Sequence, residues 1–277
     1  MKKLFSHLVP RTSYLVPRTS YLVLFYLLSP LFASAQKSVE ADAKVDFVTH
    51  YVWRGTDVGG VYIQPSGALK WQGLSLKMAA STPLAKEDPT EIDITLGYTL
   101  GPVNIGVTDY WMTGNDYDGR NLYFSYEAER GAHQFEGNIG FTCRYFSLQG
   151  YTMFWGNDFK YDNPDNALSR EQGKRAFSTY IELNIPFYMA GLDWDLRGGM
   201  TPFESANTIV PTTVVNGIQH YQKEHFYADG PRCISASLRA TKNFELGDIK
   251  VPVFFEFNSN PYLQTAYFIV GMSVIPF

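Results

Sequence analysis

The sequence predicts an all-β fold: a closed, antiparallel, up-and-down transmembrane β-barrel of about 12 strands, with short periplasmic turns and longer outer loops. Three observations lead to this prediction. The chain starts with a segment typical of secreted proteins, the rest alternates apolar with polar residues over about a dozen segments, and the last residue is the aromatic Phe277. A final strand ending in Phe is a recurrent feature of barrels inserted by the outer-membrane assembly machinery, so Phe277 is the expected assembly signal.

Residues 1–35 have the pattern of a cleaved signal peptide. Two lysines near the start precede an apolar core from Leu22 to Phe32, and Ala33 to Ala35 form a small-x-small cleavage site. A membrane-anchor helix is the alternative, but the core is short for one and contains Pro30. We therefore expect residues 36–277 to form a single barrel domain.

Composition narrows the class of protein. The net charge of −4 gives no reason to expect nucleic acid as a partner, since nucleic-acid-binding proteins usually have a basic patch. The mean hydropathy of −0.16 is too low for a helical membrane protein. Aromatic residues make up 16% of the chain, which suits a barrel with aromatic girdles at two membrane interfaces.

Alternation is the main structural signal. Ile92, Ile94 and Leu96 alternate with Glu91 and Asp93, and side chains on a strand point to opposite faces with a period of two. An even number of strands is typical of bacterial barrels, so we take Leu122 to Thr142 as one long strand rather than two. The predicted strands are 43–54, 60–71, 73–81, 91–100, 102–113, 122–142, 146–156, 176–186, 191–201, 232–243, 249–258 and 266–277.

The connections alternate between short and long, as the turns and loops of outer-membrane barrels do. Residues 157–175 and 203–231 form the longest ones. A connection as long as 203–231 suggests a loop with structure or function of its own.

Closure of the sheet follows from the hydrocarbon environment, because every backbone N–H and C=O must be paired there. A soluble β-sandwich or a lipocalin-like barrel is the alternative. It would turn the apolar rows inward, and a barrel of this size would then need a large apolar interior or a ligand. The charged second row suits a polar lumen better.

Taking the polar rows as inward gives a set of candidate lumen residues with nearly balanced charge. They either line a narrow aqueous pore and set its selectivity, or pair with one another and plug the barrel. The candidates are Lys44, Asp46, His50, Arg54, Lys70, Lys77, Glu91, Asp93, Glu136, Glu182, Asp193, Asp195, Arg197, Arg239, Lys250 and Glu256.

Three residues fall outside this scheme. Asp109 shares a row with apolar residues, so we expect it at the outer rim, above the aromatic belt. Cys143 and Cys233 are expected at opposite ends of the barrel, which makes them two free thiols rather than a disulfide.

The segment Tyr51-Val-Trp53-Arg54-Gly55, followed by Pro65, resembles the TorF family of porins. Members of this family have such a motif at the end of the first strand and a proline in the second. Residues 91–93, the strand of Glu136 and the chain from Lys250 to the end are also similar to the family pattern. The resemblance implies an outer-membrane barrel of the porin class, with no catalytic residues and no defined solute.

The motif also has a physical interpretation of its own. Arg54 is expected to point inward just below the outer rim, where a guanidinium can form a forked bond with a carboxylate on a neighbouring strand. Gly55 permits the tight turn that follows. Arg54 is then either a structural latch or a ligand-binding residue.

Three functions remain open at this stage. The first is passive diffusion of small polar solutes through the lumen of a barrel held in outer-membrane lipid, without a cofactor or metal. The second is a plugged barrel that binds a partner through the 203–231 and 157–175 loops. The aromatic and basic residues of the first loop suggest it, namely Tyr221, Phe226 and Tyr227 beside His220, Lys223 and His225. The third is an outer-membrane hydrolase with His50 as its base. No Gly-x-Ser-x-Gly or His-x-x-x-His motif supports catalysis, so we expect no enzyme.

Overall fold

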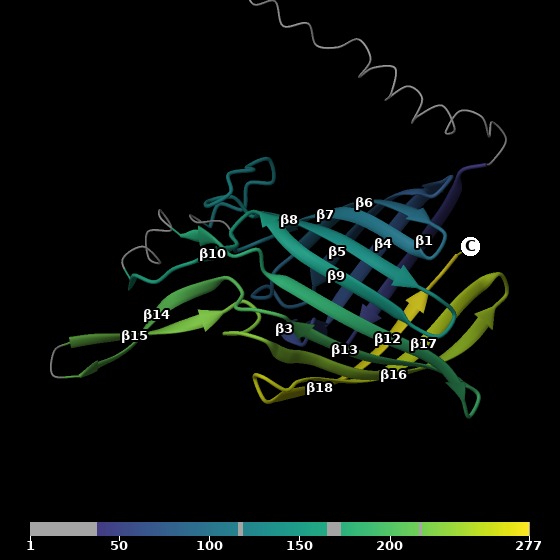
Figure 1. The fold of residues 1–277 in the computed structure, drawn as a ribbon. Helices are drawn as coiled ribbons and strands as arrows, with labels where there is room; N and C mark the ends of the chain where they lie inside the picture. Colours follow the sequence, from purple (N-terminus) through teal and green to yellow (C-terminus); the bar gives the residue numbers. More distant parts are fainter. Residues whose placement is uncertain (1–37, 116–118, 165–172, 216–217, 277) are drawn as a thin grey trace, which may run out of the picture. The chain divides into compact units, whose positions relative to one another are not determined.

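The computed structural model describes residues 38–115, 119–164, 173–215 and 218–276. Twelve antiparallel strands form one closed barrel in chain order (Figure 1). They are β1 (Glu40–Val48), β4 (Tyr62–Trp71), β5 (Leu74–Pro83), β6 (Glu91–Leu100), β7 (Val103–Met112), β8 (His133–Thr142), β9 (Ser147–Trp155), β12 (Thr179–Met189), β13 (Leu192–Thr201), β16 (Arg232–Leu246), β17 (Ile249–Asn260) and β18 (Thr265–Val274).

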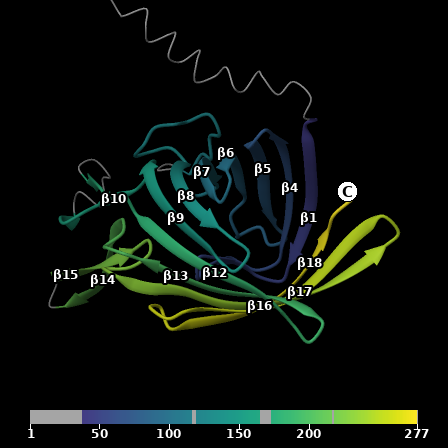
Figure 2. The same ribbon diagram turned by 45° about the vertical axis from the view of Figure 1, so that its right-hand side comes forward.

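The barrel closes through its first strand. Val45 of β1 lies opposite Pro65 of β4 on one side and Val274 of β18 on the other. Figure 2 shows the strands curving round a common centre. None of the twelve strands is left as a free sheet edge, which confirms the predicted all-β, up-and-down architecture.

Three further hairpins lie in the connections at one end of the barrel, which we call the long-loop end. They are β2 (Tyr51–Trp53) with β3 (Thr56–Gly59), β10 (Phe159–Lys160) with β11 (Lys174–Arg175), and β14 (Asn207–Val215) with β15 (Ile218–His225). The last of these projects away from the barrel (Figure 1). The 203–231 connection therefore does contain structure of its own.

The opposite end, which we call the short-turn end, is made of tight turns. Gln72 and Gly73 both have positive φ angles, 50° and 87°, and so do Ala190 and Gly191, at 55° and 79°. Two successive residues with positive φ match the right-handed twist of the flanking strands. The alternation of short and long connections is thus as the sequence predicted.

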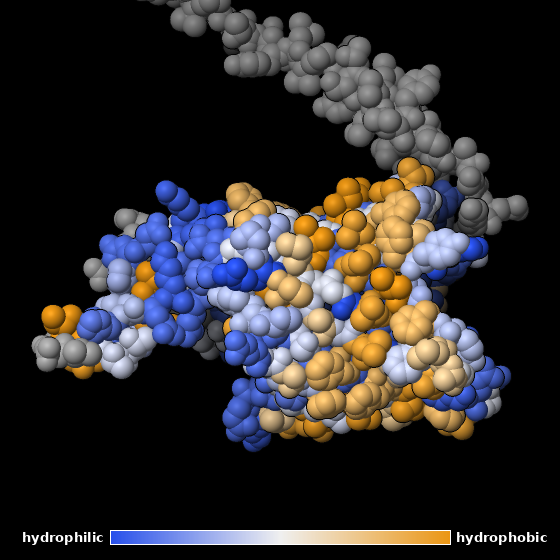
Figure 3. Space-filling view, turned by 60° about the horizontal axis from the view of Figure 1, so that its bottom comes forward, coloured by the Kyte–Doolittle hydropathy of each residue, from blue (hydrophilic) through white to orange (hydrophobic). Residues whose placement is uncertain are grey.

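The two faces of each barrel strand differ in residue type and in exposure, as the alternating pattern predicted. On β17, Phe255 and Phe257 are 47% and 38% exposed on the outer surface, whereas Glu256 is 3% exposed inside. On the face shown in Figure 3, hydrophobic residues gather over the barrel, and hydrophilic residues cover the long-loop end. On β18, whose facing was undecided from sequence, Phe268 and Val270 point outward and Ile269 inward.

The predicted strand 43–54 is wrong in its second half. The barrel strand ends at Val48, and Tyr51 to Trp53 pair with β3 instead. The TorF-like motif therefore lies in a hairpin and not at the end of the first strand. Alternation continues through both segments, because a hairpin packed inside a barrel also has two different faces.

The predicted strand 122–142 is wrong in its first half. Strand β8 begins at His133, and the preceding residues form turns, one of them closed by the bond from Gly131 N to Glu127 O of 2.8 Å. This segment, residues 119–132, lies against the outer surface of β7 and β8. The indole of Trp155 donates to the carbonyl of Tyr126 at 3.2 Å, which ties the segment to β9 as well.

Asp109 points to the outer surface, as its row predicted, but its carboxylate is covered. Its Oδ1 lies 2.8 Å from Nδ1 of His133, whose ring is buried beneath Tyr123 and Tyr126. His133 Nε2 bonds the carbonyl of Tyr123. The 119–132 segment thus screens this pair from the surroundings of the barrel.

Cys143 lies in a turn at the short-turn end, and Cys233 lies at the start of β16, at the long-loop end. Both are free. Within the described ranges, no helix is long and apolar enough to cross a bilayer. The expected signal peptide, 1–35, and the expected assembly signal, Phe277, lie outside the described residues.

Candidate functional site: the lumen and its inward hairpin

The β2–β3 hairpin folds into the barrel rather than away from it. Its turn uses positive φ angles at Arg54, 51°, and Gly55, 80°. Gly55 sits directly on the backbone of β16, and a Cβ added there would overlap the carbonyl oxygen of Ile234. Only glycine combines this backbone conformation with so close an approach.

Arg54 crosses the lumen to a strand far from its own. Its Nη1 and Nη2 donate to the two carboxylate oxygens of Glu136 on β8, at 2.6 and 2.8 Å. The side chains of Arg54 and Glu136 are 8% and 2% exposed. A forked, buried pair of this kind fixes both groups in position. The sequence anticipated a fork with a neighbouring strand, whereas the partner lies on a non-adjacent one.

Aromatic rings surround the guanidinium. Its Cζ lies 4.4, 4.3 and 4.7 Å from the ring centroids of Trp53, Tyr151 and Tyr180. The Tyr227 hydroxyl accepts a bond from Nη1 at 2.6 Å, and the Tyr110 hydroxyl donates to Glu136 at 3.0 Å. We call this group the lumen cluster; it consists of Arg54, Glu136, Trp53, Tyr110, Tyr151, Tyr180 and Tyr227.

Tyr227 enters the lumen cluster from the connection after β15. It is 3% exposed, and burial raises the pKa of its hydroxyl above the usual value. Its backbone N–H donates to Ser205 Oγ at 2.8 Å, which joins the two ends of this connection. The neighbouring Ala206 N–H donates to Ser178 Oγ at 2.7 Å, directly before β12, and so ties the connection to the barrel. The 203–231 segment therefore contributes to the interior as well as to the outer surface.

The hairpin is also held at its sides. Tyr51 donates to Glu91 of β6 at 2.7 Å, and Gly60 N donates to Asp88 at 2.9 Å. Tyr62, which is fully buried, donates to the carbonyl of Pro89 at 2.8 Å. Contacts to β6, β8, β9, β12 and β16 together place the hairpin inside the ring of strands.

Two cavities lie on either side of the lumen cluster. A cavity of about 450 Å³, which we call the vestibule, is at the long-loop end, and another of about 490 Å³ is at the short-turn end. Along β8, Gln134 lines the vestibule, Glu136 belongs to the cluster, and Asn138 lines the second cavity. Along this strand, the lumen cluster therefore lies between the two cavities.

The candidate lumen residues fall into two groups. The first group lies on barrel strands, at positions whose side chains face the interior of the barrel. They are Lys44, Asp46, Lys70, Lys77, Glu91, Asp93, Glu136, Glu182, Asp193, Asp195, Arg197, Arg239, Lys250 and Glu256. His50 and Arg54 lie outside the barrel strands, before and within the β2–β3 hairpin.

Several of the inward charges have partners. Arg239 donates to Glu256 at 2.6 Å, and Lys44 pairs with Asp46 at 2.6 Å. Other inward acids accept from neutral groups: Asn243 donates to Asp193 at 2.7 Å and Tyr180 to Glu182 at 3.0 Å. The described part of the interior therefore combines local contacts along the wall with contacts from the β2–β3 hairpin, among them Arg54 to Glu136 and Tyr51 to Glu91.

His50 follows the end of β1 and so is not part of the first barrel strand. Its Nε2 lies 2.8 Å from the Asp57 carboxylate, and its ring stacks on Tyr267 at 5.2 Å. In the described part of the chain, no group of three or more His, Cys, Asp or Glu residues is arranged to hold a metal ion.

Sequence reasoning missed the aromatic part of the lumen cluster. Tyr110, Tyr151 and Tyr180 occupy inward positions on their strands, and their row could have identified them. It did not, because only charged residues were taken as lumen candidates. Tyr227 lies in an irregular connection, where no periodic pattern exists to assign a direction.

Comparisons with known proteins identify no family. No protein-family model matches the sequence, and no curated protein matches it. Solved structures with related architecture include an outer-membrane channel from Pseudomonas putida F1, with 12% identity over 87% of this chain and 96% of that one and a TM-score of 0.39. The OmpF protein of Salmonella typhi matches with 7% identity over 86% and 97%, at a TM-score of 0.33. At these values the similarity adds nothing to the architecture described above.

Proposed function

We propose that the mature protein, residues 36–277, is an outer-membrane channel that passes small polar solutes through a narrow, charged lumen. The observation that carries the proposal is the position of the β2–β3 hairpin between two cavities of one lumen. In this proposal the hairpin is the constriction, and the Arg54–Glu136 fork holds it in place.

The outer surface supports a membrane location. Leu96, Ile105 and Ile139 are 60%, 51% and 61% exposed on neighbouring strands, an arrangement that is unfavourable in water and favourable against acyl chains. In this proposal residues 1–35 direct export, Phe277 is the signal to the assembly machinery, and the short-turn end faces the periplasm. The TorF-like motif agrees with a channel of the porin class.

Planar-bilayer recordings with the purified mature protein test the proposal. We expect small, discrete current steps from the intact protein. A variant in which residues 51–59 are replaced by a short Gly-Ser turn should give steps several times larger, because the constriction is removed. If both proteins give no steps above background, the barrel is plugged and the proposal fails.

A matched control separates the hairpin from loops in general. Shortening the tip of the β14–β15 hairpin, which points away from the barrel, should leave the current steps unchanged. If the hairpin-deleted protein and the tip-shortened protein conduct equally, then β2–β3 is not the constriction.

A further inference from the structure

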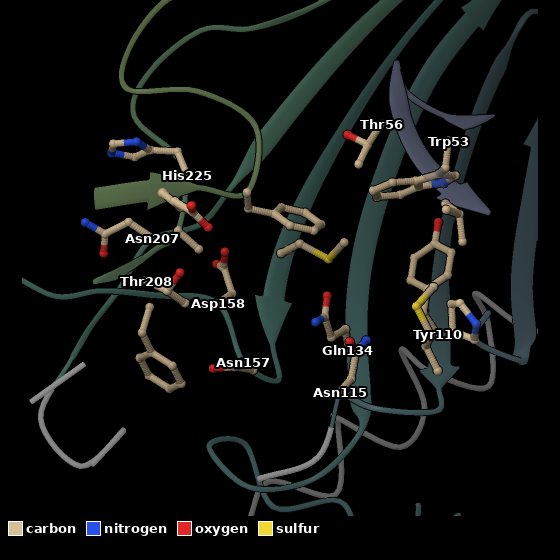
Figure 4. A pocket seen from close by; sticks show the side chains of 18 of the residues that line it. Trp53, Thr56, Tyr110, Asn115, Gln134, Asn157, Asp158, Asn207, Thr208 and His225 are labelled. Carbon is tan, nitrogen blue, oxygen red and sulfur yellow. The ribbon is translucent and has the colours of Figure 1, made fainter. Parts of the chain in front are cut away.

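The vestibule is a partly open cavity of a size that suits a small organic molecule. Its volume of about 450 Å³ lies within the range of ordinary ligand pockets. Its wall combines apolar rings with polar groups, and Figure 4 shows Trp53, Tyr110, Gln134 and Asp158 around the same space.

The fixed charge of the vestibule wall is negative. Its lining includes the carboxylates of Asp57, Glu91, Asp158 and Glu224, whereas no described lysine or arginine is part of it. Glu91 is buried and accepts a hydrogen bond from the hydroxyl of Tyr51, so only Asp57, Asp158 and Glu224 are considered as ligand contacts.

The lysines and arginines near the vestibule contact groups other than its lining carboxylates, with Arg175 as a partial exception. Lys160 pairs with Glu204 at 3.4 Å, and Lys223 with Asp162 at 3.0 Å. Arg175 lies 4.6 Å from the Phe159 centroid and donates to Gly156 O at 3.2 Å, so it offsets part of the charge near Asp158. Arg54 is neutralised by Glu136. Two histidines also contact acids here: His50 Nε2 lies 2.8 Å from Asp57, and His225 Nε2 lies 3.3 Å from Glu204. A negative surplus remains within the described lining.

Aromatic rings lie in the vestibule wall together with these carboxylates. Phe226 is 39% exposed and lies 5.8 Å from Trp53, and Tyr110 lies 6.1 Å from the same indole. Aromatic faces attract cations as well as apolar bodies. Rings next to a lining with more carboxylates than lysines and arginines complement a molecule with an apolar body and an ammonium group.

We propose that the vestibule binds small organic amines in their cationic form, with the apolar body against Phe226 and Trp53 and the ammonium group toward Asp57, Asp158 and Glu224. This inference rests on the proposed channel only for its physiological meaning, as a selective entrance. The binding site itself requires only the folded barrel.

Three probes with one phenethyl or benzyl body test the charge preference: phenethylamine, 2-phenylethanol and phenylacetate. Isothermal titration of the folded mature protein in detergent should rank them in that order. The amine should bind at least about tenfold more tightly than the anion, since two exposed carboxylates and one buried carboxylate all favour it. Equal binding of the three probes, or a preference for phenylacetate, overturns the proposal.

Variants locate the site. Asp57→Asn and Glu224→Gln change exposed residues, so the fold should tolerate them. Each should weaken phenethylamine binding about threefold to fivefold and leave 2-phenylethanol unchanged. Asp248→Asn, in a turn at the opposite end, is the matched control and should change neither. If both vestibule variants bind the amine as the wild type does, the proposed site is wrong.

The pH dependence gives an independent check. Burial raises the pKa of Asp158 above the usual value, although the Ser178 amide lowers it in part. As the pH falls through that raised pKa, Asp158 takes up a proton and amine affinity should fall, whereas affinity for 2-phenylethanol should stay constant. If the affinity for phenethylamine does not change with pH in the acidic range, Asp158 does not bind the ammonium group.

Current recordings separate this inference from the proposed function. If current steps occur and phenethylamine added at the long-loop side blocks them more strongly than phenylacetate, both proposals are supported. Steps without this difference overturn the amine site and keep the channel. Amine-selective binding without any steps overturns the channel and keeps the site.

Discussion

Arg54 and Glu136 bind each other through two hydrogen bonds, 2.6 and 2.8 Å long, although 82 residues separate them in the chain. Both side chains are almost completely buried. Desolvating two charges is costly, and the cost is recovered only when the geometry is good and the remaining hydrogen-bonding capacity is used. Tyr110 meets part of that requirement by donating to Glu136, and Tyr227 meets part of it by accepting from Arg54.

Removing one partner of this pair should be more harmful than removing both. We expect Arg54→Met to lower the free energy of unfolding by about 3 to 5 kcal/mol, because Glu136 is then left buried and unpaired. The double variant Arg54→Met/Glu136→Leu should recover a large part of that loss. Urea unfolding of the protein in lipid vesicles measures both.

The exposed pair of Lys44 and Asp46 is the control for that experiment. Lys44 is 45% exposed, so Lys44→Met should change stability by no more than about 1 kcal/mol. A double variant at Arg54 and Glu136 whose loss equals the sum of the two single losses would show that the pair is not coupled.

Gly55→Ala should displace the β2–β3 hairpin. Its φ angle of 80° disfavours any side chain, and the added methyl group would overlap the carbonyl of Ile234. We expect a loss of at least about 1 kcal/mol in unfolding free energy, together with larger current steps. Gly198→Ala on β13, where a Cβ meets open space, should be neutral in both assays. Equal effects at the two positions would contradict the close contact.

The two free cysteines report which end of the barrel faces the cell exterior. In the Cys143→Ser variant, a membrane-impermeant maleimide added to intact cells should label Cys233, which is exposed at the long-loop end. In the Cys233→Ser variant, Cys143 should react only after the outer membrane is permeabilised. Labelling of Cys143 in intact cells would reverse the proposed orientation.

Acid should weaken the contact between Asp162 and Lys223, which joins the connection after β10 to the β14–β15 hairpin. The Lys223 ammonium, 3.0 Å away, lowers the pKa of Asp162. A lowered carboxyl pKa stabilises the folded contact above the ordinary value of about 3.9, and that contribution is lost as the pH falls through the lowered value. NMR titration with carboxyl-labelled aspartate should show Asp162 titrating at higher pH in Lys223→Gln.

The barrel was predictable from sequence because each of its strands has two unlike environments. Glu91, Ile92 and Asp93 alternate since one face of β6 meets the lumen and the other the surroundings. The same logic failed for the β2–β3 hairpin and for the 119–132 segment. Each lies against a wall of the barrel, so its residues also alternate between two environments although they do not belong to the wall.

The candidate site was predictable only in part. The inward position of Glu136 follows from its row, and the TorF-like motif contains Arg54 and Gly55. The partnership of Arg54 with Glu136 could not be derived, because it depends on a hairpin turning inward, which no local periodicity encodes. Tyr227 is a similar case, since a long connection places it.

The pairing of β1 with β18 joins positions that are distant in the chain, as in the 2.6 Å bond from Ser273 to Asp46, 227 residues apart. Because the two strands run antiparallel, Glu40 at the start of β1 and Val274 at the end of β18 lie at the same rim. The twelve hydrogen-bonded strands therefore form a closed ring, and the strand pairing does not require the chain to begin at β1. A circular permutant that joins these two ends with a short linker and opens the chain at Gly247 would keep every strand neighbour of the parent protein.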